Sequence, residues 1–235
     1  NDGTLTLGQD GGTQTYGGGL TTTSVGSTVT LNGTIATSND AVVLGAVTLG
    51  SATTIDTNAT DTTGDITIAA VTGGSNTLTL TTENNIANTD ITASGAISGV
   101  TTLTLASVGG TATLSADVDV TTLSVDNTVA NVAFTGNGSS VANAVTFAND
   151  GTLILGASGG TQTYGGGLTT TSVGSTVTLN GTIATSNDAV VLGAVTLGSA
   201  TTIDTNATST TGDITIAAVT GGSNTLTLST GDNVA

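Results

Sequence analysis

The sequence has 235 residues, of which 36% are hydrophobic, 2% aromatic and 7% charged, and its formal net charge is -16 because Lys, Arg and His are absent. Nucleic-acid binding requires cationic side chains that neutralise phosphates, and attraction to anionic lipid requires basic clusters, so neither partner is expected. No apolar run reaches the ~18 residues of a membrane span, and we expect no direct membrane insertion of this segment. The absence of Cys excludes a disulfide framework and thiolate metal ligands.

The sequence repeats itself with one long period. Residues 1–87 align with residues 149–235, and 79 of the 87 pairs are identical. Self-similarity at a fixed period is typical of repeat architectures. We therefore expect residues 1–148 to form one full period of a continuous β-solenoid and residues 149–235 a partial second period, with no separate globular domain. The chain is interpreted as a window of a longer polypeptide.

Strands are predicted by a recurring three-residue unit, apolar-polar-apolar, whose outer side chains point to one side and whose middle side chain points to the other. A positive mean hydropathy of +0.31 argues against disorder, and no run has helical periodicity. The units are Leu5–Leu7, Val29–Leu31, Val47–Leu49, Ile66–Ile68, Leu78–Leu80, Leu103–Leu105, Leu123–Val125, Val132–Phe134, Val145–Phe147 and Leu153–Leu155.

The spacing of these units predicts the architecture. Several follow one another at about 20 residues, separated by turn pairs such as Gly11-Gly12 and Asn32-Gly33. The prediction is an all-β parallel β-helix with about 20–22 residues per coil and essentially no helix. Seven such coils fill one period and rise about 34 Å. Antiparallel hairpins are the alternative, favoured locally by Asn32-Gly33, and the weakest stretch, residues 84–99, predicts a wider coil or a loop.

The sequence offers few groups for catalysis or metal binding, and we expect no enzyme. Imidazole, thiolate and lysine bases are absent. A carboxylate pair remains the one alternative, as in glycoside hydrolysis, with Asp117 and Asp119 or Asp61 and Asp65 as candidates. Asp56, Asp61 and Asp65 are weak candidates for a metal site, and loosely bound Ca²⁺ screening the acidic rod is the simpler expectation. No cofactor is expected.

Tyr16 and Tyr164 are the only tyrosines, lie one period apart and are each followed by three glycines. If they are exposed, they form a row of contact points along one side of a fibre. If they are buried, they fill the core where the glycines leave space. Both alternatives stay open.

Adjacent threonines recur near the predicted strand starts and suggest an ice-binding or glycan-binding surface. Thr is also a favoured strand residue on a solvent-facing side, and adjacent residues of a strand face opposite sides, which favours a structural role. The threonines concerned are Thr21, Thr22, Thr23, Thr53, Thr54, Thr81, Thr82, Thr101, Thr102, Thr121 and Thr122.

The segments TQTYGGGL, STVTLNGTI and GDITIAAVTGGSNTLTLTT resemble the β-strand repeats of large bacterial exoproteins of the filamentous haemagglutinin and autotransporter-adhesin kind. The resemblance implies a right-handed parallel β-helix, an extracellular location on the cell surface and a stalk or fibre role. It implies partners that are copies of the chain along a fibre, or a host or neighbouring cell surface or matrix. The expected function is therefore a passive, protease-resistant rod, and a Thr-rich ligand-binding β-helix is the alternative.

Overall fold

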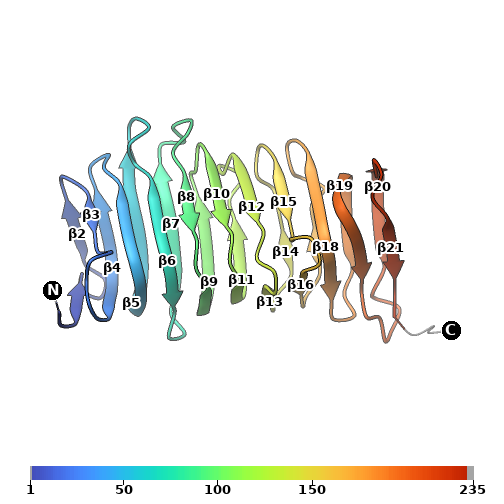
Figure 1. The fold of residues 1–235 in the computed structure, drawn as a ribbon, viewed down its shortest axis with the longest axis horizontal. Coiled ribbons are helices and arrows are strands. Elements are labelled where there is room, and N and C mark those ends of the chain that lie inside the picture. The colour runs from blue at the N-terminus through green and yellow to red at the C-terminus, as the bar shows by residue number, and fades with distance from the viewer. Residues whose placement is uncertain (1, 232–235) are drawn as a thin grey trace.

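The computed structural model describes residues 2–231, and within this range the chain is an elongated stack of β-strands without helices (Figure 1). The strands of the first period are β1 (Leu5–Leu7), β2 (Thr13–Tyr16), β3 (Leu20–Thr21), β4 (Val29–Thr37), β5 (Val42–Ala59), β6 (Ile66–Thr72), β7 (Leu78–Glu83), β8 (Ile91–Ala93), β9 (Ile97–Ala106), β10 (Thr111–Leu114), β11 (Val118–Val125), β12 (Asn131–Phe134), β13 (Ser140–Val141) and β14 (Val145–Thr146). Those of the second are β15 (Leu153–Leu155), β16 (Thr161–Tyr164), β17 (Leu168–Thr169), β18 (Val177–Thr185), β19 (Val190–Asp204), β20 (Ile214–Thr220) and β21 (Leu226–Ser229).

All strand pairings between these elements are parallel, and the chain winds through about 10 turns of a β-solenoid. Each turn passes three stacked columns of strands, which we call face 1, face 2 and face 3. Face 1 begins with β1, face 2 with β2 and face 3 with β3, and their next neighbours lie on β4, β4 and β5. The predicted fold class is confirmed and the hairpin alternative is wrong.

The Asn32-Gly33 pair turns a corner within β4 instead of closing a hairpin. Gly33 has a φ of 61°, and the register of β4 against β5 shifts between Leu31 and Gly33. A Cβ at Gly33 would overlap the carbonyl oxygens of Gln9 and Gly12 on the preceding coil. The glycine therefore lets the chain bend from face 1 to face 2 while both coils stay in contact.

The core is a narrow column of aliphatic side chains inside the coil. The outer residues of each three-residue unit point inward, and Leu31, Ile55 and Leu80 are all fully buried. Each coil covers the apolar interior of its neighbour, as expected for a structure stabilised by contacts between adjacent repeats. Phe134 and Phe147 are fully buried core residues.

Coil length varies more than the sequence pattern predicts. Val29 stacks on Val47 in a short coil, and the β5 strand that follows runs through three faces without a break over 18 residues. The coil that leads from Val71 to its stacking partner Ile97 is much longer. This wide coil contains most of the weakly patterned residues 84–99, where Asn85 and Asn88 have positive φ, so the prediction of a wider coil there is confirmed.

The sequence period does not equal seven coils, which corrects the predicted value. Along face 1, six successive pairings lead from Thr6 to Ser140. The repeat equivalent of Thr6 is Ile154, which lies two faces further on, in β15 on face 3. One period is therefore six and two-thirds coils, about 32 Å of rise, and the second copy is rotated by one third of a turn.

Candidate interaction surfaces

A row of threonines on the outside of the solenoid is common to both copies of the repeat. Thr13, Thr34, Thr54 and Thr79 lie on four consecutive coils of face 2, each in register with the next. We call this set the threonine row. Each member is exposed or half-buried, while neighbouring residues such as Ile35 and Ile55 point into the core. The row presents hydroxyl and methyl groups at the ~4.8 Å spacing of strands.

The second copy repeats the threonine row on another face. Thr161, Thr182, Thr202 and Thr227 are in register on four consecutive coils of face 1. The two rows have identical residues but different directions. Because the second copy is rotated by one third of a turn, the same row of threonines occurs on two different faces of the solenoid.

Adjacent threonines point to opposite sides, as strand geometry requires. Thr22, Thr53 and Thr82 are buried, whereas Thr54 and Thr81 are half-exposed on the outside. Buried threonines bond to the chain: Thr53 Oγ1 donates to the Ser51 carbonyl (3.0 Å), and Thr82 Oγ1 to the Ser107 carbonyl (2.7 Å). In these pairs the inward threonine is structural and the outward one is accessible, whereas neither member of Thr101-Thr102 or Thr121-Thr122 is buried.

Asp117 and Asp119 lie on the same side of the chain in two different environments. The Asp117 Oδ1 accepts a hydrogen bond of 2.7 Å from the Gly138 backbone amide on the next coil. Asp119 lies in the part of β11 that belongs to face 1. Together with Ser75, Thr101 and Ser140 it borders a shallow hollow of about 420 Å³. Asp117 does not line this hollow. The geometry thus pairs Asp117 with backbone and not with Asp119.

The hollow results from a bulge in β9. Gly99 has a φ of 66°, and the register of β9 against β11 shifts next to it, between Asp119 and Val120. The extra residue widens face 1 locally. Sequence reasoning singled out Asp119 and, separately, Thr101, but it did not bring them together with Ser75 and Ser140, because the hydroxyls come from three other coils.

The candidate metal ligands Asp56, Asp61 and Asp65 are each engaged separately. Asp56 accepts from the Asn58 amide (2.9 Å), Asp61 from the Thr63 amide (2.9 Å) and hydroxyl (2.7 Å), and Asp65 from the Asp90 amide (2.8 Å). Within residues 2–231 no three acidic side chains are grouped as metal ligands.

The pKa values of two of these carboxyl groups shift in opposite directions. Partial burial raises the pKa of Asp56, and the hydrogen bond that its carboxylate accepts from the Asn58 amide opposes that shift. The Thr63 hydroxyl and amide, with Asn39, lower the pKa of the exposed Asp61. These contacts secure loops, and the Asn39 Oδ1 also accepts from the Asp61 amide (2.9 Å) on the next coil.

Tyr164 is fully buried, which supports the core alternative for this residue and excludes it as a surface contact. Its ring packs edge-on against Phe134, with centroids 6.4 Å apart and an interplanar angle of 73°. Its hydroxyl donates to Gln162 Oε1 (2.9 Å), and the Gln162 Nε2 donates to the Phe134 carbonyl (2.9 Å). Sequence reasoning missed Gln162, although the alternation in TQTY places it on the same side as the tyrosine.

Tyr16 has the same neighbours in sequence but a different environment. It lies in the first described coil of face 2, is half-buried, and its hydroxyl has no hydrogen-bond partner among residues 2–231. Burial raises the pKa of Tyr16. Because Tyr16 lies on face 2 and Tyr164 on face 1, the two do not form one row along a fibre.

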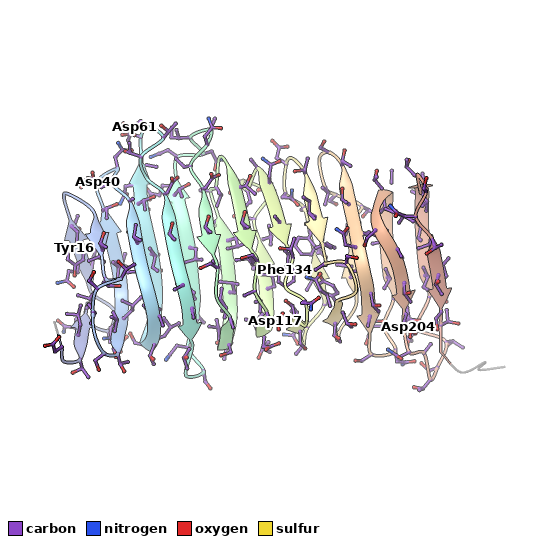
Figure 2. All side chains as sticks on the ribbon, in the orientation of Figure 1. Tyr16, Asp40, Asp61, Asp117, Phe134 and Asp204 are labelled. Carbon is purple, nitrogen blue, oxygen red and sulfur yellow. The ribbon has the colours of Figure 1, made fainter. Side chains whose placement is uncertain are left out.

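In Figure 2 the loop residues Asp40 and Asp61 lie at one long edge of the stack, and Asp204 of β19 lies toward the opposite edge. Among residues 2–231 no helix could span a membrane. Comparison of the chain with protein-family profiles, curated proteins and solved structures gives no match. The fold and the repeat place the chain in the class of β-solenoid repeat proteins.

Proposed function

We propose that this chain is a structural segment of a secreted cell-surface filament or adhesin stalk, in which it acts as a passive, protease-resistant rod. The observation that carries the proposal is the continuous stacking of parallel strands on three faces from β1 to β21. Pulling along the axis loads hydrogen bonds on all three faces of each coil together. The buried aliphatic residues form one continuous cluster from Leu7 to Ile203, so this part of the chain is not divided into separate domains that could come apart under load.

Composition supports the same proposal. With no Lys or Arg, trypsin-type proteases have no cleavage site. The net charge of -16 keeps neighbouring rods apart until cations, including loosely bound Ca²⁺, screen it. The proposal includes the extracellular location, the absence of catalysis and of nucleic-acid partners, and assembly with copies of the chain along a fibre or contact with a host or neighbouring cell surface or matrix.

Electron microscopy and diffraction of the native material test this function. A rod predicts a layer line at about 4.8 Å along the fibre axis. Compact particles without that spacing would contradict it. Elastase digestion, which does not depend on basic residues, should be slow for the folded chain and fast in urea, and equal rates would contradict protection by the fold.

A ligand-binding surface is the second candidate, favoured by the threonine row on four consecutive coils. Its neutral hydroxyls both donate and accept hydrogen bonds, which suits ice or a glycan. The chain would then show thermal hysteresis or binding on a glycan array, and replacing Thr34 and Thr54 by Val should abolish the effect. Thr30→Val tests whether the effect belongs to face 2, because Thr30 lies in a separate file of threonines on face 1, in register with Thr6, Thr48 and Thr72.

A further inference from the structure

The last described coil carries apolar residues that are buried in the first copy of the repeat. Among residues 2–231, β20 and β21 pair with β19 and with no other strand. Val219 of β20 and Leu228 of β21 are 43% and 53% exposed, whereas their repeat equivalents Val71 and Leu80 are buried. The difference follows from stacking, because β9 covers Val71 and Leu80.

The first described coil is open on the opposite side. Leu5, Tyr16 and Leu20 of β1, β2 and β3 are half-buried, and their strand partners among residues 2–231 lie on β4 and β5 alone. Their repeat equivalents in β15, β16 and β17 are buried, because β12, β13 and β14 lie on the other side of them. The second copy therefore shows what kind of surface this coil packs on.

That surface is a succession of apolar residues on three strands. In the second copy, β15 stacks on residues 132–134, Tyr164 on Val141 and Leu168 on Val145. The open end of the last coil has an equivalent succession. Its members are Ile214, Ile216, Val219, Leu226 and Leu228.

A polar contact of that surface also has a counterpart. The amide and the hydroxyl of Thr152 both donate to Asn131 Oδ1 on the neighbouring coil (2.9 and 2.8 Å). Thr4 is the repeat equivalent of Thr152 and is exposed. Asp213 precedes the apolar residues of β20 as Asn131 precedes those of β12, and Asp65, its repeat equivalent, accepts from an amide of the next coil. Asp213 is thus placed to accept from Thr4 of a stacked chain.

We propose that these two ends bind each other, so that a second copy of this chain stacks head to tail with its β1, β2 and β3 on β20 and β21. The inference rests on the proposed rod and names the contact by which copies join. All strands stay parallel across the joint, and the unpaired edges supply the hydrogen bonds. The contact is heterologous and open, so it repeats along a fibre.

The winding of the chain determines how the second copy is turned. β20 passes face 2 and face 3, and β21 lies on face 1. The next position of the winding is on face 2, where β1 of the incoming copy stacks on residues 214–216. Ten successive pairings lead from Thr6 to Ser229 along face 1. Copies therefore follow one another at ten and one-third coils, about 50 Å.

Electron microscopy and sedimentation of the 235-residue chain over a concentration series test the contact, in salt that screens its charge. Rods should lengthen with concentration at constant width and show an axial repeat of about 50 Å. A repeat of about 100 Å, from head-to-head pairing, would overturn the inference and leave the rod intact. Side-by-side association, or rods of one chain at every concentration, would do the same. Compact particles would overturn the rod itself.

Val219→Asp and Leu228→Asp each place a carboxylate in the joint and should abolish lengthening. Ile154→Asp is the matched control, because Ile154 is also exposed (37%) but lies on the side of the rod. Circular dichroism checks that the variants fold. Equal loss of lengthening in all three would overturn the inference. Asp213→Ala should weaken association on the order of tenfold, whereas Asp213→Asn should retain it, and an Asp213→Ala chain that assembles like the parent would contradict the contact with Thr4.

Mixing two variants tests the polarity of the joint. Val219→Asp leaves the first coil intact, and Tyr16→Asp leaves the last coil intact. Each variant alone should stay monomeric, and the mixture should stop at dimers that contain one of each. Monomers only, or long rods, in the mixture would overturn head-to-tail stacking.

Discussion

The Tyr164 hydroxyl donates a hydrogen bond of 2.9 Å to Gln162 Oε1 inside the solenoid, with both side chains buried. The identical pair one period earlier, Gln14 and Tyr16, is more exposed, and there Gln14 Oε1 accepts from the Gly8 amide (2.7 Å). Tyr164 has Val141 of β13 beside it on one side and Thr185 of β18 on the other, whereas among residues 2–231 the strand partner of Tyr16 is Thr37 of β4.

Tyr164→Phe is expected to destabilise the fold by about 1–3 kcal/mol, because it leaves the buried Gln162 Oε1 without its donor. Tyr16→Phe is the matched control, since the Tyr16 hydroxyl is buried without a partner among the described residues. It should leave the free energy of unfolding unchanged or slightly raise it. Urea unfolding of the two variants measures the difference, and equal destabilisation would contradict the assigned hydrogen bond.

Leu80→Ala is expected to lower the free energy of unfolding by about 2–5 kcal/mol, because Leu80 is fully buried and the change leaves a cavity. Thr79→Ala on the same strand is the control. Thr79 faces outward in the threonine row, and its loss should cost less than about 1 kcal/mol. The denaturation midpoints of both variants test whether Leu80 points inward and Thr79 outward in β7. A larger loss of stability for Thr79→Ala than for Leu80→Ala would refute this assignment.

Gly95→Ala is expected to destabilise the chain, because a Cβ at this position would overlap the carbonyl oxygen of Ala69 on the neighbouring coil. Gly18→Ala should be tolerated, since nothing lies within 4 Å of its Cβ position. Thermal unfolding followed by circular dichroism compares them. Equal melting temperatures would show that the two coils do not approach as closely as described.

Asp56 should give the fold a component of stability that is greatest in acid. Its pKa is raised in the folded state, so the folded chain holds the proton more tightly than the unfolded chain does. This contribution is present below the ordinary pKa of aspartate and is lost as the pH rises through the raised value. Asp56→Asn should therefore be at least as stable as the parent chain at pH 7 and should flatten the pH dependence of the urea midpoint in acid.

Asp61 should behave in the opposite way. Its pKa is lowered by Thr63 and Asn39, so its contribution is present above the ordinary pKa and is lost as the pH falls through the lowered value. Asp61→Asn should reduce stability at pH 7 and have no effect at strongly acidic pH. The same sign of effect for both variants would contradict the assigned environments.

The candidate surfaces could be predicted from sequence only in part. Alternation within a strand indicated that Thr53 and Thr54 face opposite sides, and the structure agrees. The same pattern could not indicate which outward threonines share a row, because the separation along the chain between row neighbours changes from coil to coil. Nor could it indicate that Asp119 borders a hollow, which depends on the bulge at Gly99.

Local patterns were enough to predict the parallel coils, the strand units and the inward position of their apolar residues, because period-two alternation and β-branched side chains act over a few residues. The rotation of the second copy relative to the first can be determined only from the stacked coils of the tertiary structure. Residue spacing does not reveal how many faces a segment passes: β5 crosses three faces in one strand of 18 residues, whereas the coil from Val71 to Ile97 is much longer. Over one period these differences accumulate to a third of a turn, and for that reason identical tyrosines and threonines occupy different faces.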